Sequence, residues 1–212
     1  MIAEPDVALT DFALAIEAGC LGALLSRRGA VTAARRWWTA FFWSVGTGAL
    51  LGGVSHGFVP PPYGVGGTVL WRLTLLAIGA AALAAWGAGA QALGGSAASE
   101  IVAAASVLFA AYAAIVLLVT DAFAVAIAHY APAAVFLFGV LLRVWRRTRV
   151  PAALAGVLGL LVLAAGSLAQ WAGLAITPVH LTHNAVYHLF EMLALVLLYR
   201  AARWLSAARP PC

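Results

Sequence analysis

A polar cluster opens the last apolar segment of the chain, within residues 182–191. It contains the two histidines His183 and His188, the asparagine Asn184 and the glutamate Glu191. Ionisable side chains in a hydrocarbon environment require a partner, a water-filled cavity or a metal ion. Neutral imidazoles are common zinc ligands, and a zinc-bound water becomes hydroxide near neutral pH. The chemistry that these residue types could support is therefore metal-assisted hydrolysis.

The spacing within this cluster limits which side chains can act together. Residues at i, i+4 and i+7 share one face of a helix, so Asn184, His188 and Glu191 point in one direction. His183 and His188 point about 140° apart on an ideal helix and could share one ion only if the first turn is distorted. The best metal pair is therefore His188 with His56, near the end of the second apolar segment. The third ligand stays open among His183, Asn184, His180 and His129.

The composition places these residues in a membrane protein. Of the 212 residues, 65% are hydrophobic and 9% are charged, which is more apolar than a soluble domain of this length. The chain contains no lysine, which excludes a retinal or pyridoxal Schiff base. The net charge of +5 comes from arginines that membrane topology explains better than nucleic-acid binding does. We expect a multi-pass protein of a bacterial inner membrane that contacts membrane lipid and no nucleic acid.

Seven segments are long and apolar enough for membrane-spanning helices of about 20 residues. The first three are expected at about 7–26, 36–58 and 67–92. The fourth starts near 99 and the fifth ends at 143. The sixth covers about 151–174, and the seventh starts between 178 and 183 and ends near 205. The break between the fourth and fifth helices falls either at Thr120-Asp121 or at His129–Pro132. Proline is favoured at a helix start, so Pro132 favours the second position. The sequence thus predicts an all-α bundle of seven transmembrane helices, forming one domain over residues 1–212.

The arginines indicate how this bundle is oriented. Eleven of the 12 lie in three clusters, within residues 27–36, 143–149 and 200–209. Seven helices place all three clusters on one side, which the positive-inside rule makes cytoplasmic. The N-terminus is then outside and the C-terminus cytoplasmic. All five histidines and six of the seven acids fall in the outer half, so we infer one polar cavity at, or just beneath, the outer face.

This plan resembles a superfamily of seven-helix membrane hydrolases that includes the alkaline ceramidases and the progestin and adipoQ receptors. The resemblance rests on three elements: Ser55-His56 near the end of the second helix, Asp121 on a middle helix, and Asn184 to His188 in the last helix. The superfamily has His-x-x-x-His in its last helix. In this chain Asn184 stands where the first histidine of that motif would be, and His183 lies one position earlier.

The resemblance implies a zinc-dependent amidase or esterase that acts on a membrane lipid. The implied zinc ligands are His56, His188 and His183. The other implied site residues are Asp121 or Glu191 as proton shuttle and Ser55 as hydrogen-bond donor to the oxyanion. The alternative is a non-enzymatic seven-helix protein, such as a sensor, a carrier of small solutes or metal ions, or a haem-binding protein. A transporter would have broken helices meeting at the bilayer midplane, whereas here the polar groups gather on one side.

Overall fold

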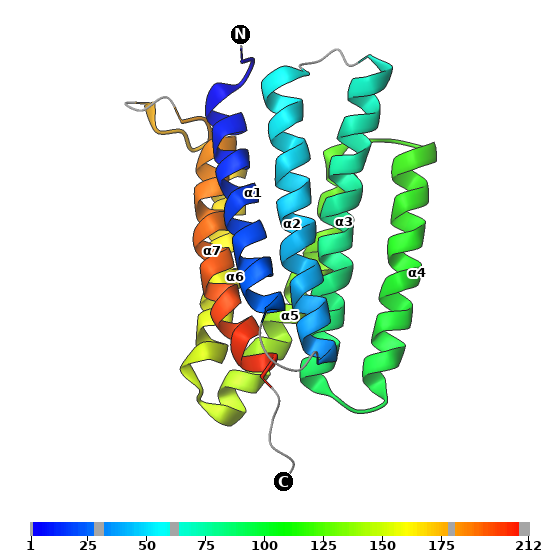
Figure 1. Cartoon of the computed structure of the whole chain (residues 1–212), viewed down its shortest axis with the longest axis vertical. Helices are drawn as coiled ribbons and strands as arrows, with labels where there is room; N and C mark the ends of the chain where they lie inside the picture. Colours follow the sequence, from blue (N-terminus) through cyan, green and yellow to red (C-terminus); the bar gives the residue numbers. More distant parts are fainter. Residues whose placement is uncertain (1, 28–31, 60–63, 178–180, 208–212) are drawn as a thin grey trace.

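The computed structural model describes all residues except 1, 28–31, 60–63, 178–180 and 208–212. The described residues form seven α-helices, which are α1 (Pro5–Ser26), α2 (Ala33–Phe58), α3 (Val65–Leu93), α4 (Ala97–Leu118), α5 (Phe123–Thr148), α6 (Pro151–Trp171) and α7 (His183–Leu205). The helices stand side by side in one bundle, so that α1 begins at one end and α7 finishes at the other (Figure 1). The prediction of an all-α fold is confirmed.

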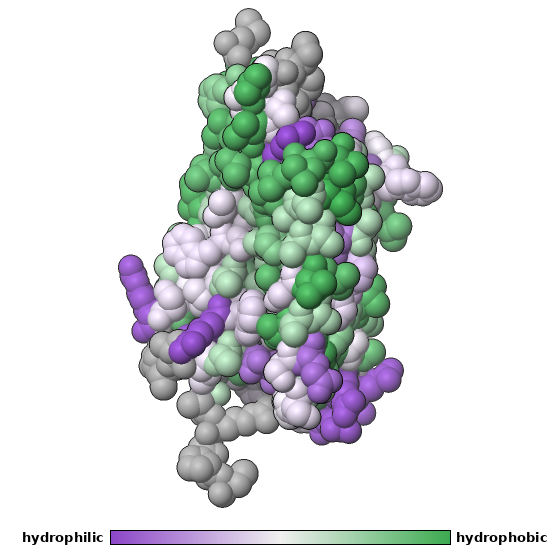
Figure 2. Space-filling view, turned by 90° about the vertical axis from the view of Figure 1, so that its right-hand side faces the viewer, coloured by the Kyte–Doolittle hydropathy of each residue, from purple (hydrophilic) through white to green (hydrophobic). Residues whose placement is uncertain are grey.

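Six of the seven helices are long and apolar enough to cross a membrane, and the exception is α2. Its 26 residues are sufficient in number, but glycine, serine, threonine and tryptophan dilute the apolar side chains. It nevertheless packs along both α1 and α3 within the bundle (Figure 1). The face in Figure 2 is mainly hydrophobic over its middle and upper parts, and hydrophilic side chains gather toward its lower end. These features indicate a multi-pass membrane protein.

The break between α4 and α5 lies at Thr120-Asp121, so the prediction that placed Pro132 at a helix start is wrong. The hydroxyl oxygen of Thr120 accepts a hydrogen bond from the backbone N–H of Ala122, and the Asp121 carbonyl accepts one from the indole N–H of Trp71. These two bonds stabilise the turn. Pro132 lies inside α5 instead, as prolines in membrane-spanning helices do when the surrounding bundle supports them.

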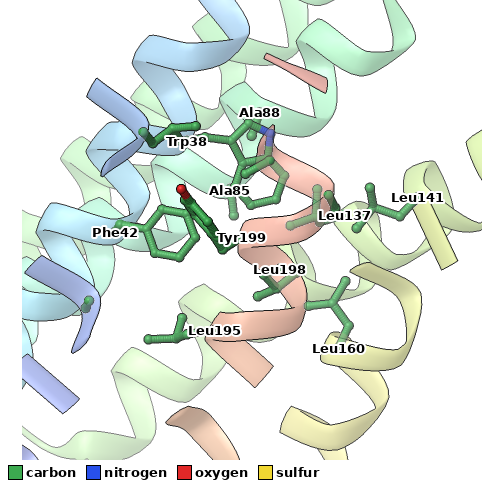
Figure 3. Packing of buried hydrophobic residues seen from close by; sticks show 14 of the residues in the cluster. Trp38, Phe42, Ala85, Ala88, Leu137, Leu141, Leu160, Leu195, Leu198 and Tyr199 are labelled. Atoms are coloured by element: carbon green, nitrogen blue, oxygen red, sulfur yellow. The ribbon is translucent and has the colours of Figure 1, made fainter. Parts of the chain in front are cut away.

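A hydrophobic core packs the helices against one another, and Figure 3 shows part of it. Trp38 and Phe42 of α2 are fully buried, with ring centroids 6.4 Å apart. The ring of Phe42 also meets Tyr199 of α7 edge-on, at a centroid distance of 6.0 Å. Leu137 of α5 and Leu198 of α7 belong to the same buried cluster. This packing fixes α2, α5 and α7 relative to one another.

Candidate ligand-binding cavity

A cavity of about 320 Å³ lies inside the bundle, toward the end at which α1 begins. It is lined by residues of every helix except α4, and Leu14, Val45 and Ile78 are among its apolar walls. Its polar lining residues are Asp11, His56, Thr74, Tyr130, Gln170, Asn184, Tyr187, His188 and Glu191. The cavity lies at the end of the bundle where we expected a polar cavity, and the side of the membrane that this end faces stays a prediction.

His188 is held between two side chains of α1. Its Nδ1 lies 2.9 Å from the hydroxyl oxygen of Thr10, and its Nε2 lies 3.4 Å from Oδ1 of Asp11. The Thr10 hydroxyl oxygen also lies 2.8 Å from the carbonyl oxygen of Asp6 and 3.0 Å from that of Val7, and the tautomer of His188 sets which group donates in the Thr10–His188 contact. The Nε2–Oδ1 contact is an ion pair when the imidazole is protonated. The contact is buried, because the side chains of His188 and Asp11 are 13% and 6% exposed.

Glycines on α2 make room for the Asp11 carboxylate. A Cβ added to Gly52 would lie 3.2 Å from Oδ2 of Asp11, and one added to Gly53 would lie 2.9 Å from the Phe12 ring. Larger residues at these two positions would push α1 away from α2 or displace the carboxylate. Oδ2 of Asp11 is buried and has no hydrogen-bond partner among the described residues. One oxygen of the carboxylate is therefore packed against α2 without a hydrogen bond.

Two polar contacts tie the start of α1 to its neighbours above the cavity. Oε2 of Glu4 lies 2.9 Å from Nδ1 of His56, whose ring also meets the Trp71 ring edge-on at 6.3 Å. Oδ2 of Asp6 accepts two hydrogen bonds from Thr182, one from its backbone N–H at 2.8 Å and one from its hydroxyl at 2.7 Å. The first contact joins α1 to α2, and the second joins α1 to the residue that precedes α7.

The predicted face of α7 does line the cavity, since Asn184, His188 and Glu191 all belong to its wall. The Oδ1 atom of Asn184 accepts a hydrogen bond of 2.9 Å from Nε2 of Gln170, which joins α7 to α6. Glu191 forms no hydrogen bond or ion pair with another residue in the described part of the chain. Its carboxyl group therefore faces the cavity with its hydrogen-bonding capacity unused.

The three predicted zinc ligands do not come together. His56 and His188 line one cavity, whereas His183 is the exposed first residue of α7 and is absent from the cavity wall. The physical reason is the five-residue spacing, which turns His183 away from His188 on a regular helix. Within the described ranges, no three His, Cys, Asp or Glu side chains are grouped to hold a metal ion. These residues thus do not fit a three-histidine zinc site, and zinc remains a prediction.

The other candidates for the third ligand lie apart from the two cavity histidines or already have a hydrogen-bond partner. His129 stacks on the ring of Tyr112, with centroids 4.3 Å apart, and is not part of the cavity wall. Asn184 lines the cavity but is bonded to Gln170. His180 lies outside the described residues.

Two of the three predicted catalytic residues lie away from the cavity wall. Ser55 is 2% exposed and its hydroxyl has no hydrogen-bond partner among the described residues, but it does not line the cavity. Asp121 lies in the α4–α5 turn, where its Oδ2 is 3.7 Å from Nε of Arg72. Only Glu191 of this set faces the cavity. Ser55 and Asp121 therefore do not contact the cavity in which their predicted catalytic roles would be needed.

Several residues of the site carried no role in the sequence prediction. Asp11 and Thr10 hold His188, and Gln170 holds Asn184. Asp11 did carry a signal, because a carboxylate within an apolar helix requires a partner. No spacing within the chain identifies that partner as a histidine on α7.

Comparison with known proteins gives the chain a family. A profile described as "Family of unknown function (DUF6962)" matches residues 7–207, which include all seven helices apart from the first two residues of α1. No curated protein and no solved structure matches the chain. Since the matched region extends over nearly the whole sequence, the chain belongs to the DUF6962 family.

Proposed function

We propose that this protein is a multi-pass membrane protein that binds a small organic cation, a protonated amine, in its central cavity. The observation that carries the proposal is the Glu191 carboxyl group, which faces the cavity without a hydrogen-bond or ion-pair partner among the described residues. A carboxylate in such a place requires a cation, a proton or water. The carboxyl group of Asp11, which also belongs to the cavity wall, adds a second acidic group beside the same space.

The charge of the cavity wall supports a cationic ligand. Two carboxyl groups, Asp11 and Glu191, contribute to the wall, whereas no arginine is among its described residues. The remaining wall is largely apolar, with Leu14, Val45 and Ile78 among its side chains. Apolar walls with a few convergent polar groups are typical of small-molecule sites. The ligand that fits both properties has an ammonium group on a short hydrocarbon body.

We also propose that all seven helices cross the bilayer and that the cavity lies toward the non-cytoplasmic side. The support for the first point is the position of α2, which packs along α1 and α3 although it is less apolar than they are. The support for the second is the arginine distribution, because the ends of α5 and α7 that carry arginines lie opposite the cavity. Cysteine labelling from either side of sealed vesicles tests this orientation.

A thermal-shift experiment on the purified full chain tests the ligand class. Hexylamine should raise the melting temperature, whereas hexanol and hexanoate at the same concentration should not. A ligand at about 100 times its Kd stabilises the folded state by about 2.7 kcal/mol. Glu191→Gln should abolish the hexylamine shift. Glu100→Gln is the control, because Glu100 is an acid in the first turn of α4, outside the cavity wall, and it should keep the shift. An equal response to hexanol would refute the cationic ligand.

The second candidate function is the zinc-dependent lipid amidase or esterase that the superfamily resemblance implies. One observation favours it, namely that His56 and His188 line the same cavity although they lie on different helices. Metal analysis of the purified protein separates the two functions. Stoichiometric zinc that is lost in His56→Ala and in His188→Ala would favour the hydrolase over the amine-binding protein.

A further inference from the structure

A groove of about 410 Å³ lies at the end of the bundle opposite the cavity, where α7 finishes and α6 begins (Figure 1). Its walls are formed by Arg200, Arg203 and Trp204 near the end of α7, Ala207 beyond it, and Ala152 in the first turn of α6. Two guanidinium groups and an indole thus border the groove, and the other two lining residues are small. This groove shares no residue with the cavity.

The two guanidinium groups of the groove are not neutralised by the described residues. Arg200 and Arg203 are exposed and three positions apart, so their side chains are neighbours on one face of α7. No described acidic side chain forms an ion pair with either of them. Like charges at this spacing repel each other. An anion from outside the chain would relieve that repulsion.

The backbone and one side chain of the groove are held in place. A Cβ added to Gly156 of α6 would lie 2.8 Å from the Cβ of Ala201, so the two helices approach closely beside the groove. The Cζ atom of Arg203 lies 5.8 Å from the centroid of the Tyr199 ring, an aromatic contact that restricts this long side chain. The helix positions that carry the two arginines are therefore fixed before any ligand arrives.

We propose that this groove binds the phosphate-bearing headgroup of an anionic phospholipid. Guanidinium groups form paired hydrogen bonds with phosphate oxygens, which suits Arg200 and Arg203. Trp204 matches the headgroup level, where indole rings are enriched. The volume lies in the range of about 300–1,000 Å³ that small-molecule sites occupy. A lipid is favoured over soluble phosphate because the groove lies at the end of helices whose sides are apolar enough to face hydrocarbon.

Native mass spectrometry of the detergent-solubilised full chain tests this site. Phosphatidylglycerol should bind at one preferred site, and phosphatidylcholine should bind more weakly. An arginine beside anionic lipid contributes about fivefold in affinity, so the double variant Arg200→Gln/Arg203→Gln should bind phosphatidylglycerol about thirtyfold more weakly. The matched control is Arg146→Gln/Arg147→Gln, which removes two arginines from the end of α5 outside the groove. It should change the affinity by less than about twofold.

Three outcomes would overturn the proposal. Equal losses in the two double variants would mean that the lipid responds to general surface charge. Binding of phosphatidylcholine as tight as that of phosphatidylglycerol would remove the role of the net negative charge. Displacement of the lipid by an equal concentration of inorganic phosphate would assign the groove to a soluble anion.

A second variant removes the space and keeps the charge. Ala152→Trp should fill the groove between α6 and α7 while both arginines remain, and it should weaken phosphatidylglycerol binding about as much as the double arginine variant. Retention of full binding in Ala152→Trp would contradict a headgroup seated in the groove. A single size-exclusion peak and an unchanged melting temperature verify that each variant is folded.

Discussion

The contact between Asp11 and His188 should contribute a measurable interaction energy between α1 and α7. Each side chain is almost fully buried, so removing one leaves the other without its partner at a cost of about 1–3 kcal/mol. Polar pairs between membrane helices average about 0.6 kcal/mol and reach about 1.7 kcal/mol. We expect a coupling energy near the upper value, because Thr10 also holds the imidazole ring. The loss of unfolding free energy in the double variant should then be smaller than the sum of the losses in the two single variants.

The assay is a double-mutant cycle with Asp11→Ala, His188→Ala and the double variant. The free energy of unfolding is measured by titrating the protein in mild detergent with a denaturing detergent. Additivity within about 0.3 kcal/mol would refute the contact. A pair of threonines supplies an internal control. Thr10→Val should cost about 1 kcal/mol, whereas Thr74→Val should cost less, because the Thr74 hydroxyl bonds only to the Leu70 carbonyl of its own helix.

The other predictions concern helix packing and the α4–α5 turn. Gly159→Ala should destabilise the protein by about 1–3 kcal/mol, because the added Cβ would lie 3.0 Å from the carbonyl oxygen of Ala194 on α7. Gly139→Ala, whose added Cβ would meet nothing within 4 Å, should stabilise the protein by up to about 1 kcal/mol. Equal melting temperatures for these two glycine variants would contradict both predictions. Asp121→Asn should cost under about 1 kcal/mol, because its ion pair with Arg72 is partly exposed, and should preserve the hexylamine shift. Loss of that shift would place Asp121 in the site.

The helices could be predicted from the sequence because their signals are local. Apolar runs of sufficient length predict each helix, and Pro151 does begin α6 as expected. The break near Thr120 was predicted wrongly because Pro132 is a strong helix-start signal. The turn at Thr120-Asp121 is instead stabilised partly by Trp71, which lies about 50 positions earlier in the chain. That contact depends on α3 being beside the turn, which no local pattern shows.

The candidate site was also predictable only where its signals are local to one helix. Helical periodicity alone places Asn184, His188 and Glu191 on one face, and all three line the cavity. The choice of His183 as a ligand required a distorted first turn, whereas α7 begins at His183 as a helix. The partner of His188 is Asp11, which is 177 positions away and is brought near by the packing of α1 against α7. Such a pairing depends on which helices are neighbours, and the sequence leaves that arrangement open.

The glycine-rich composition of α2 has a consequence for how the protein is made. A segment that is less apolar than its six companions partitions weakly into lipid by itself as it leaves the ribosome. Its glycines instead allow close approach to α1, as Gly53 does beside the Phe12 ring. We therefore expect α2 to enter the bilayer together with α1 as a helical hairpin, so that substitutions on the facing side of α1 would impair biogenesis before they affect the finished protein.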